Sequence, residues 1–428
     1  MIRKFFALAL FAAATHPAFA AEACQVGAYR GPDGDFVALA QSTLNPAGGL
    51  RYLFRDGRRG ATDDAGSPVH CTGEGMRVGE GAGAKRWTRI AFRETPTTFG
   101  SAGTELTGML IEPVDADPTR PLVVMVHGSE RSSPIGGIYG YAMAAQGLSV
   151  FVYDKRGTGS SEGEYTQNFE LLASDAAAAL GRARTMAAGR FGRAGFFGGS
   201  QGGWVAPLAA TLTPADFVAV GFGLVASPIE EDREQLVSEV RAARLGADAE
   251  AKVNRLSQAT AKLLLSNFAE GYAELDAARA ALADQPWAKA IEGEYSGAMM
   301  RMDDATLRRI GRARFDNLEL IWDYDAVAAL KKLDSPLLWV LAGEDREAPI
   351  ETTRAALTDL AAAGWPVDVY LFPETDHGMF EFTTDAGGER HITRITDGYL
   401  KLLGDWMKGE VAGRYGRAEH LTAKISPR

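Results

Sequence analysis

One short stretch of the chain has the composition expected around a reactive serine. In GFFGGSQGGWVAP, residues 195–207, a single serine stands among five glycines. Ser200 lies in a G-x-S-x-G pattern between an apolar run and a helical stretch. Glycines at 198 and 202 suit a sharp strand-to-helix turn, because side chains there would collide with neighbouring backbone. Such a turn exposes the serine oxygen above a helix N-terminus, which favours negative charge. The pattern predicts a nucleophilic serine.

The same glycines are compatible with a phosphate-binding loop or a simple turn. A phosphate loop needs a lysine after its last glycine, whereas Trp204 follows Gly203. The dinucleotide pattern G-x-G-x-x-G is also absent from this stretch. The nucleophile hypothesis therefore depends on partners elsewhere in the chain.

A serine hydroxyl is nearly unreactive unless a base removes its proton. The chain has six histidines. Five lie in places that disfavour this role, namely a leader, a small N-terminal segment, a strand end, an expected helix and a polar tail: His16, His70, His127, His391 and His420. His377 remains, in FPETDHGMF after the last expected strand, where a carboxyl-end loop can form a site. An ordinary surface histidine is the alternative.

The base needs a carboxylate to orient its ring and stabilise the imidazolium. LAGEDREAP, residues 341–349, follows the preceding strand, and Asp345 is the expected acid. Glu344 and Glu347 remain open as alternatives. The order Ser200, Asp345, His377 is that of hydrolases with a nucleophile elbow.

A developing oxyanion needs preorganised donors, usually backbone N–H groups. One is expected from Gln201, directly after the serine. The other is expected from Ser129, in the loop after the apolar run 121–128, with Glu130 the next choice. An ordinary strand-ending turn is the alternative for HGS, residues 127–129.

These loops require a particular scaffold. Apolar runs alternate with helical patterns, and a final helix is expected over 388–408. The expected strands are 121–128, 148–154, 193–199, 217–227, 336–343 and 367–374. Fully apolar strands that alternate with helices predict an α/β fold, with a mostly parallel sheet covered on both faces.

The rest of the chain divides by composition. Residues 21–86 are rich in Gly and Asp with tight-turn pairs, which predicts a small β-rich module. Residues 229–333 contain only helical patterns, which predicts a helical cap insertion over the sheet's carboxyl edge. The expected division is a signal peptide (1–20), the β-rich module (21–86), a catalytic domain (87–228 and 334–410), the cap (229–333) and a polar C-terminal tail (411–428).

The first residues predict export. Arg3 and Lys4 precede an apolar run, and small residues precede a cut after about Ala20, as in a signal peptide. A membrane anchor is the alternative, but the apolar run is too short to span a bilayer. The expected location is therefore periplasmic or secreted. Cys24 and Cys71 would both be exported, which predicts a disulfide; free thiols, or lipid attachment at Cys24, are the alternatives.

Composition excludes several partners. The 428 residues are 46% hydrophobic and 23% charged, as in globular proteins. The formal net charge is −10, and no long Lys/Arg run occurs, which argues against binding nucleic acid or an anionic membrane surface. No membrane insertion is expected after signal removal, and the oligomeric state stays open.

Over roughly residues 87–410 the sequence resembles the α/β-hydrolase superfamily. VMVHGSER is similar to its oxyanion segment, YDKRGTGSSEG to the loop after its next strand, GFFGGSQGGW to its elbow, and DHG to its histidine loop. GEDREAP is similar to its acid loop, but is one residue shorter between Gly343 and Asp345 than the commonest form. Within the superfamily, the chain most resembles secreted bacterial esterases with a small N-terminal domain, relatives of prolyl-oligopeptidase and acyl-peptidase type enzymes. The resemblance implies hydrolysis through an acyl-enzyme, without a metal or an organic cofactor.

The sequence therefore predicts an exported serine hydrolase that cleaves carboxylic esters with Ser200, His377 and Asp345. A serine peptidase on short peptides, and a non-catalytic cell-envelope binding protein, are the alternatives. The expected substrate is a small-molecule ester or a short peptide, near Trp204 and Tyr139. No pair of glutamates on one helix offers a site for a peptide's amine. The aromatic and methionine residues of the insertion are more typical of a core than of a pocket: Phe268, Tyr272, Trp287, Tyr295, Met299, Met300 and Met302.

Overall fold

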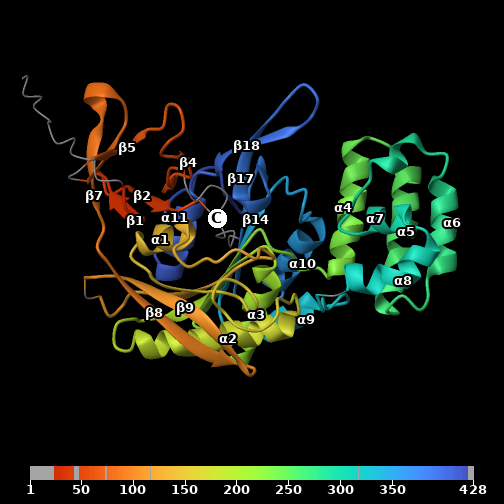
Figure 1. Cartoon of the computed structure of the whole chain (residues 1–428), viewed down its shortest axis with the longest axis horizontal. Coiled ribbons are helices and arrows are strands. Elements are labelled where there is room, and N and C mark those ends of the chain that lie inside the picture. Colours follow the sequence, from red (N-terminus) through yellow and green to blue (C-terminus); the bar gives the residue numbers. More distant parts are fainter. Residues whose placement is uncertain (1–23, 43–47, 73–74, 116, 317, 423–428) are drawn as a thin grey trace, which may run out of the picture.

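A nine-stranded sheet lies at the centre of the molecule (Figure 1). The computed structural model describes residues 24–42, 48–72, 75–115, 117–316 and 318–422. The strand order is β19-β15-β14-β13-β12-β10-β11-β9-β8. Strands β10 to β15 run parallel, whereas β8, β9 and β19 join the edges antiparallel. The strands are β8 (Phe92–Ser101), β9 (Thr104–Pro113), β10 (Leu122–Val126), β11 (Ser149–Tyr153), β12 (Ala194–Gly199), β13 (Phe217–Gly221), β14 (Leu337–Ala342), β15 (Val367–Phe372) and β19 (Glu419–His420). The predicted mostly parallel sheet is confirmed.

Helices cover both faces of this sheet, which explains the uninterrupted apolar strands. Every residue of β12 and β13 is buried. One face, with Phe196 and Trp339, packs against α2 (Phe169–Met186), α3 (Gly202–Leu212), α9 (Ala326–Leu330) and α10 (Glu351–Ala362). The other face, with Phe217 and Phe372, packs against α1 (Ile138–Ala144) and α11 (Tyr399–Lys408). Polar loops are left at the strand ends, where a site can form.

The predicted final helix over 388–408 is wrong in its first third. Residues Arg390–Ile395 form strand β18, which pairs antiparallel with β17 (Phe380–Thr384) and extends a small sheet that begins at β16 (Thr375–Asp376). Helix α11 begins only at Tyr399, after Gly398 with a φ of 90°. The helical spacing of these residues led to a wrong prediction, because strand β18 depends on pairing with another segment of the chain.

Part of the expected polar tail also joins the sheet. Strand β19 pairs with β15, and the ring of His420 stacks on that of Tyr370 with centroids 4.2 Å apart.

An antiparallel sheet precedes the central one in the chain, in the order β4-β3-β2-β1-β7-β6-β5. Its strands are β1 (Gly27–Arg30), β2 (Phe36–Ala40), β3 (Arg51–Phe54), β4 (Arg59–Ala61), β5 (Val69–Thr72), β6 (Gly75–Val78) and β7 (Lys85–Arg89), with a short 3-10 turn at η1 (Gly81–Gly83). This confirms the predicted β-rich N-terminal module. Ala28, Phe36 and Leu53 share a buried cluster with Tyr141 of α1, so the module packs directly on the sheet's helical layer. A disulfide joins Cys24 to Cys71.

A group of helices follows β13 and lies at one end of the molecule (Figure 1). They are α4 (Pro228–Ala242), α5 (Ala247–Leu265), α6 (Tyr272–Leu282), η2 (Pro286–Lys289), α7 (Ser296–Arg301) and α8 (Asp304–Phe315). Ser227 and Glu230 form a capping box that begins α4. The helices bury a core of their own, which includes Phe268, Tyr272 and Met299. Within the described ranges, no helix is long and apolar enough to cross a membrane.

Candidate active site

Ser200 lies on a strained turn between β12 and α3. Its φ is 52°, a left-handed value that is uncommon outside glycine. A Cβ at Gly198 would lie 2.2 Å from the carbonyl oxygen of Gly202, and a Cβ at Gly202 would lie 2.6 Å from that of Val126. The two glycines therefore let three backbone segments close around the serine.

His377 connects Ser200 to Asp345. Its Nε2 atom lies 3.1 Å from the Oγ of Ser200, and its Nδ1 atom lies 3.0 Å from Oδ2 of Asp345. Oδ1 of Asp345 also accepts the backbone N–H groups of Glu347 and Ala348, at 3.1 and 2.7 Å. The three side chains come from loops after β12, β14 and β15, so the parallel sheet brings them to one edge. A base held by a fixed carboxylate can accept the proton of the serine.

The two alternative acids make other contacts. Glu344 pairs with Arg390 at 2.7 Å. Glu347 approaches Nε2 of His377 at 3.5 Å, the nitrogen that faces Ser200, and not Nδ1. Asp345 alone among the three contacts Nδ1.

The charges around His377 favour its protonated form. Burial by itself lowers the pKa of His377, but the hydrogen bond and charge of Asp345, with Glu347 and Asp376 behind it, raise that pKa above the usual 6.5. The ring therefore binds a proton from the serine more strongly than a free imidazole would.

Two backbone N–H groups remain open beside Ser200. Ser129 and Gln201 line the same cavity as Ser200. Their N–H groups donate to no acceptor within the residues that the structure describes. The two carbonyl groups that flank this N–H group in the chain accept hydrogen bonds from other side chains. Lys155 donates to the carbonyl oxygen of Gly128 at 2.5 Å, and Tyr165 donates to that of Ser129 at 2.5 Å. These two hydrogen bonds fix the loop around Ser129 and leave its backbone N–H group without an acceptor beside the cavity.

Lys155 was not singled out from the sequence. It is 2% exposed, and burial lowers its pKa to about 8. A signal was present, since a lysine directly after a buried strand must find a polar partner. Two neighbours of Lys155 hold its own loop in place: Arg156 forms a two-pronged pair with Asp175 at 2.8 and 2.6 Å, and Asp154 accepts the N–H of Ser160 at 2.8 Å.

Two cavities meet at Ser200. One, of about 240 Å³, lies beside the helical group that follows β13, and Trp204 and Tyr295 contribute to its wall. The other, of about 330 Å³, is lined mainly by apolar side chains of the α1 and α11 side, with Tyr139 at its edge. Trp204 is only 7% exposed, donates to the carbonyl of Ala226 at 2.8 Å and is mainly a core residue. Tyr139 is 42% exposed.

Three carboxylates line the cavity of about 240 Å³. Glu231 comes from α4, Glu294 from the segment before α7, and Glu347 from the acid loop. Enclosure raises the pKa of Glu231 well above its usual value, and the charges of Glu294 and Glu347 raise it further. The sequence did not predict this cluster, because its members come from three elements and not from one helix.

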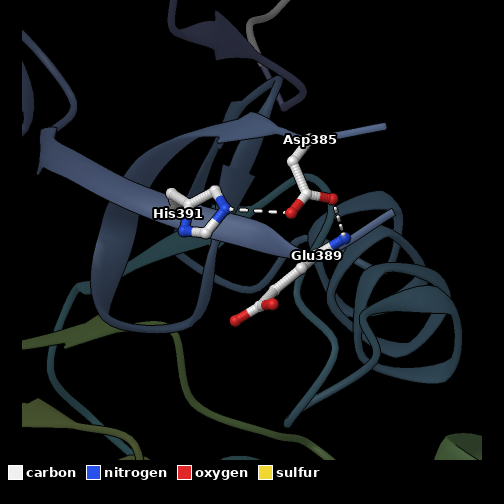
Figure 2. Close-up of side chains that lie close together, drawn as sticks. All are labelled: Asp385, Glu389 and His391. Atoms are coloured by element: carbon white, nitrogen blue, oxygen red, sulfur yellow. Dashed lines mark hydrogen bonds and ion pairs between the residues drawn. The ribbon is translucent and has the colours of Figure 1, made fainter. Parts of the chain in front are cut away.

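A possible metal-ligand group lies on the hairpin between β17 and β18. Within the described ranges, Asp385, Glu389 and His391 are the one set of three acidic or histidine groups with ligand atoms close together. All are exposed. Figure 2 shows the Asp385 carboxylate bonded to the ring of His391 and to the backbone N–H of Glu389, at 3.3 and 2.9 Å. These contacts are those of a closed turn.

Comparison with known proteins places the chain among hydrolases. The family profile described as serine aminopeptidase, S33 (Hydrolase_4) matches residues 117–381. No curated protein sequence gives a significant match. Among solved structures, an esterase of Pyrococcus furiosus is 12% identical, with 68% of this chain and 84% of that chain covered and a TM-score of 0.43. A bacterial brefeldin A esterase is 19% identical, with 68% and 70% covered and a TM-score of 0.43. An acylaminoacyl peptidase of Pyrococcus horikoshii is 15% identical, with 77% and 44% covered and a TM-score of 0.40.

Proposed function

We propose that this chain, which belongs to the serine aminopeptidase S33 family of α/β-hydrolases, is an exported esterase. Family membership makes it a serine hydrolase. The proposal of a Ser200–His377–Asp345 triad rests on one observation, the continuous chain of contacts from the Oγ of Ser200 through both ring nitrogens of His377 to Asp345.

The proposed reaction follows from these contacts. Ser200 attacks the ester carbonyl while Nε2 of His377 takes its proton, and Asp345 stabilises the imidazolium. The N–H groups of Ser129 and Gln201 hold the oxyanion. His377 then protonates the leaving alcohol, which departs from the acyl-enzyme. His377 next removes a proton from water, which attacks the acyl-enzyme, and it returns this proton to the Oγ of Ser200 as the acid is released.

The cavity on the α1 side supports an ester substrate. Its wall is apolar beside Ser200, with Ile138, Phe197 and Leu403 among the lining residues. Such a surface binds a hydrocarbon chain by removing it from water. The predicted contacts of Tyr139 and Trp204 with substrate are part of this proposal.

A serine peptidase that acts on short peptides is the second candidate. The observation in its favour is the acidic wall of Glu231, Glu294 and Glu347. A positively charged amino group next to the scissile carbonyl would be attracted there. The neutral esters of the first candidate gain nothing from that wall.

Covalent labelling separates these hypotheses. A fluorophosphonate probe should label the mature protein, and neither Ser200→Ala nor His377→Ala. Ser200→Ala should lower turnover on the order of 10⁴-fold or more, by analogy with other triads; retention above a hundredth would overturn the assignment. Ser174→Ala is the control, since the Ser174 hydroxyl donates to the carbonyl of Glu170 one turn away in α2. Comparison of p-nitrophenyl esters with aminoacyl p-nitroanilides then distinguishes esterase from peptidase. A folded protein that takes no label would favour a binding protein.

Export is proposed on separate grounds. The expected signal peptide, residues 1–20, lies outside the described residues. The disulfide between Cys24 and Cys71 supports an oxidising compartment. The N-terminal sequence of protein recovered from the periplasm or medium should begin near Ala21; an uncleaved start at Met1 would contradict export by this route.

A further inference from the structure

The apolar cavity at Ser200 continues toward the N-terminal sheet. A groove of about 500 Å³ lies between that sheet and the α1 side of the central domain. The groove and the apolar cavity share the wall residues Glu130, Pro134, Tyr139 and Phe380. The groove therefore adjoins the apolar cavity, so a chain that begins at Ser200 and follows this shared wall would end at the N-terminal sheet.

Two arginines of the N-terminal sheet face this groove. Arg51 of β3 and Arg59 of β4 both line it, and they lie on the sheet face that carries Leu53, which packs with α1. The Arg59 guanidinium lies 4.7 Å above the ring of Phe380, three residues after His377. Both arginines are partly buried. The N-terminal sheet thus brings two positive charges to the far end of the apolar path.

Neither arginine has an acidic partner in the part of the chain that the structure describes. Arg58, the adjacent residue, differs, because it pairs with Asp56 at 2.8 Å. The acid at the groove wall, Glu130, lies 3.6 Å from His127, and its charge acts on Lys155. A partly buried guanidinium without a carboxylate keeps its forked donors available to an incoming anion.

We propose that Arg59, with Arg51 beside it, binds a carboxylate at the far end of an apolar substrate chain whose ester carbonyl lies at Ser200. This rests on the proposed function. The substrate class is an ester in which several methylene groups separate the scissile carbonyl from a carboxylate, on either the acyl or the alcohol side. The N-terminal module then contributes directly to substrate selection.

Paired substrates test this specificity. For the acyl side, mono-p-nitrophenyl suberate is compared with p-nitrophenyl octanoate. For the alcohol side, ω-acetoxyheptanoate is compared with heptyl acetate. In at least one pair, Arg59→Gln should lower the charged-to-neutral ratio of kcat/KM by about tenfold, the loss typical of one charge-assisted hydrogen bond. Arg58→Gln is the matched control and should leave both ratios unchanged. Unchanged ratios in both pairs for Arg59→Gln would overturn the proposal.

A binding measurement separates this proposal from the catalytic one. Ser200→Ala protein, which needs no turnover, is titrated by calorimetry with octanoate and with its uncharged analogue octanamide. Octanoate should bind about tenfold more tightly, with a preference that Arg59→Gln removes and that weakens as salt rises. Equal affinity for the two ligands would overturn the arginine site even in an active esterase. A preference for octanoate that Arg59→Gln removes would support it even if the ester assays failed.

Discussion

The buried ammonium of Lys155 donates to the carbonyl oxygen of Gly128, and the N–H of the same peptide unit belongs to Ser129. The described peptide bonds include no cis bond, so this N–H points away from Lys155. Lys155 therefore sets the direction of a proposed oxyanion donor without touching the substrate itself.

Replacing Lys155 with Met should lower kcat by about 10- to 100-fold and change KM little, because a misdirected donor weakens transition-state binding. Lys252→Met is the control, since Lys252 pairs with Asp248 one turn away within α5. Steady-state kinetics with a short neutral ester measure both. A kcat equal to that of the wild type would remove Lys155 from the positioning of the loop.

Loss of the Lys155 proton should produce an alkaline limb in the pH profile of kcat/KM. Burial lowers its pKa to about 8, so the folded protein loses this proton as the pH rises through 8. A neutral amine is the weaker donor, and kcat/KM should fall above pH 8 in the wild type but not in Lys155→Met. The unfolded chain keeps the proton until about pH 10.5, so this group makes unfolding less favourable as the pH rises between these values.

Asp345→Asn should lower kcat on the order of 10⁴-fold, because the asparagine no longer stabilises the imidazolium. The raised pKa of His377 places the acid limb of kcat/KM above pH 6.5, since activity requires the neutral ring. Loss of the Asp345 charge should move that limb to lower pH. Glu344→Gln, which affects a pair with Arg390, is the control and should keep the limb in place. An acid limb at the same pH in Asp345→Asn as in the wild type would contradict the role assigned to Asp345.

Glu231→Gln should weaken competitive inhibition by a small primary amine such as benzylamine. Enclosure and neighbouring carboxylates raise the pKa of Glu231, so this group takes up a proton early as the pH falls. Inhibition of the wild type, measured on a neutral ester, should therefore weaken as the pH falls. Glu274→Gln, which affects a surface pair with Lys262, should behave as the wild type. Equal inhibition of both variants across the pH range would show that Glu231 does not bind the amine.

Removal of the disulfide by Cys24→Ser with Cys71→Ser should lower the free energy of unfolding of the N-terminal module by up to about 4 kcal/mol. The bond closes a segment with a sequence separation of 47, and release of that constraint favours the unfolded chain. Urea unfolding of both forms measures the difference. The hydrolysis of short neutral esters should persist, because Ser200, Asp345 and His377 lie outside the module; its loss in a folded variant would contradict this separation.

Much of the architecture followed from local patterns. Ser200, Asp345 and His377 each lie in a segment that follows an apolar strand, and parallel strands bring such segments to one edge. The glycines at 198 and 202 marked the turn, because their need for space is local. The segment 390–395 was mistaken for helix because its strand partner, β17, is defined only by folding.

The sequence by itself determined the strand and helix alternation and the three loops that carry the proposed triad, since spacing and glycine placement act over a few residues. Only the tertiary structure brought Lys155 to Gly128, gathered Glu231, Glu294 and Glu347, and placed Arg59 above Phe380. These are contacts between side chains far apart in the chain. No local pattern encodes them, because they depend on how the helices after β13 and the N-terminal sheet pack against the central sheet.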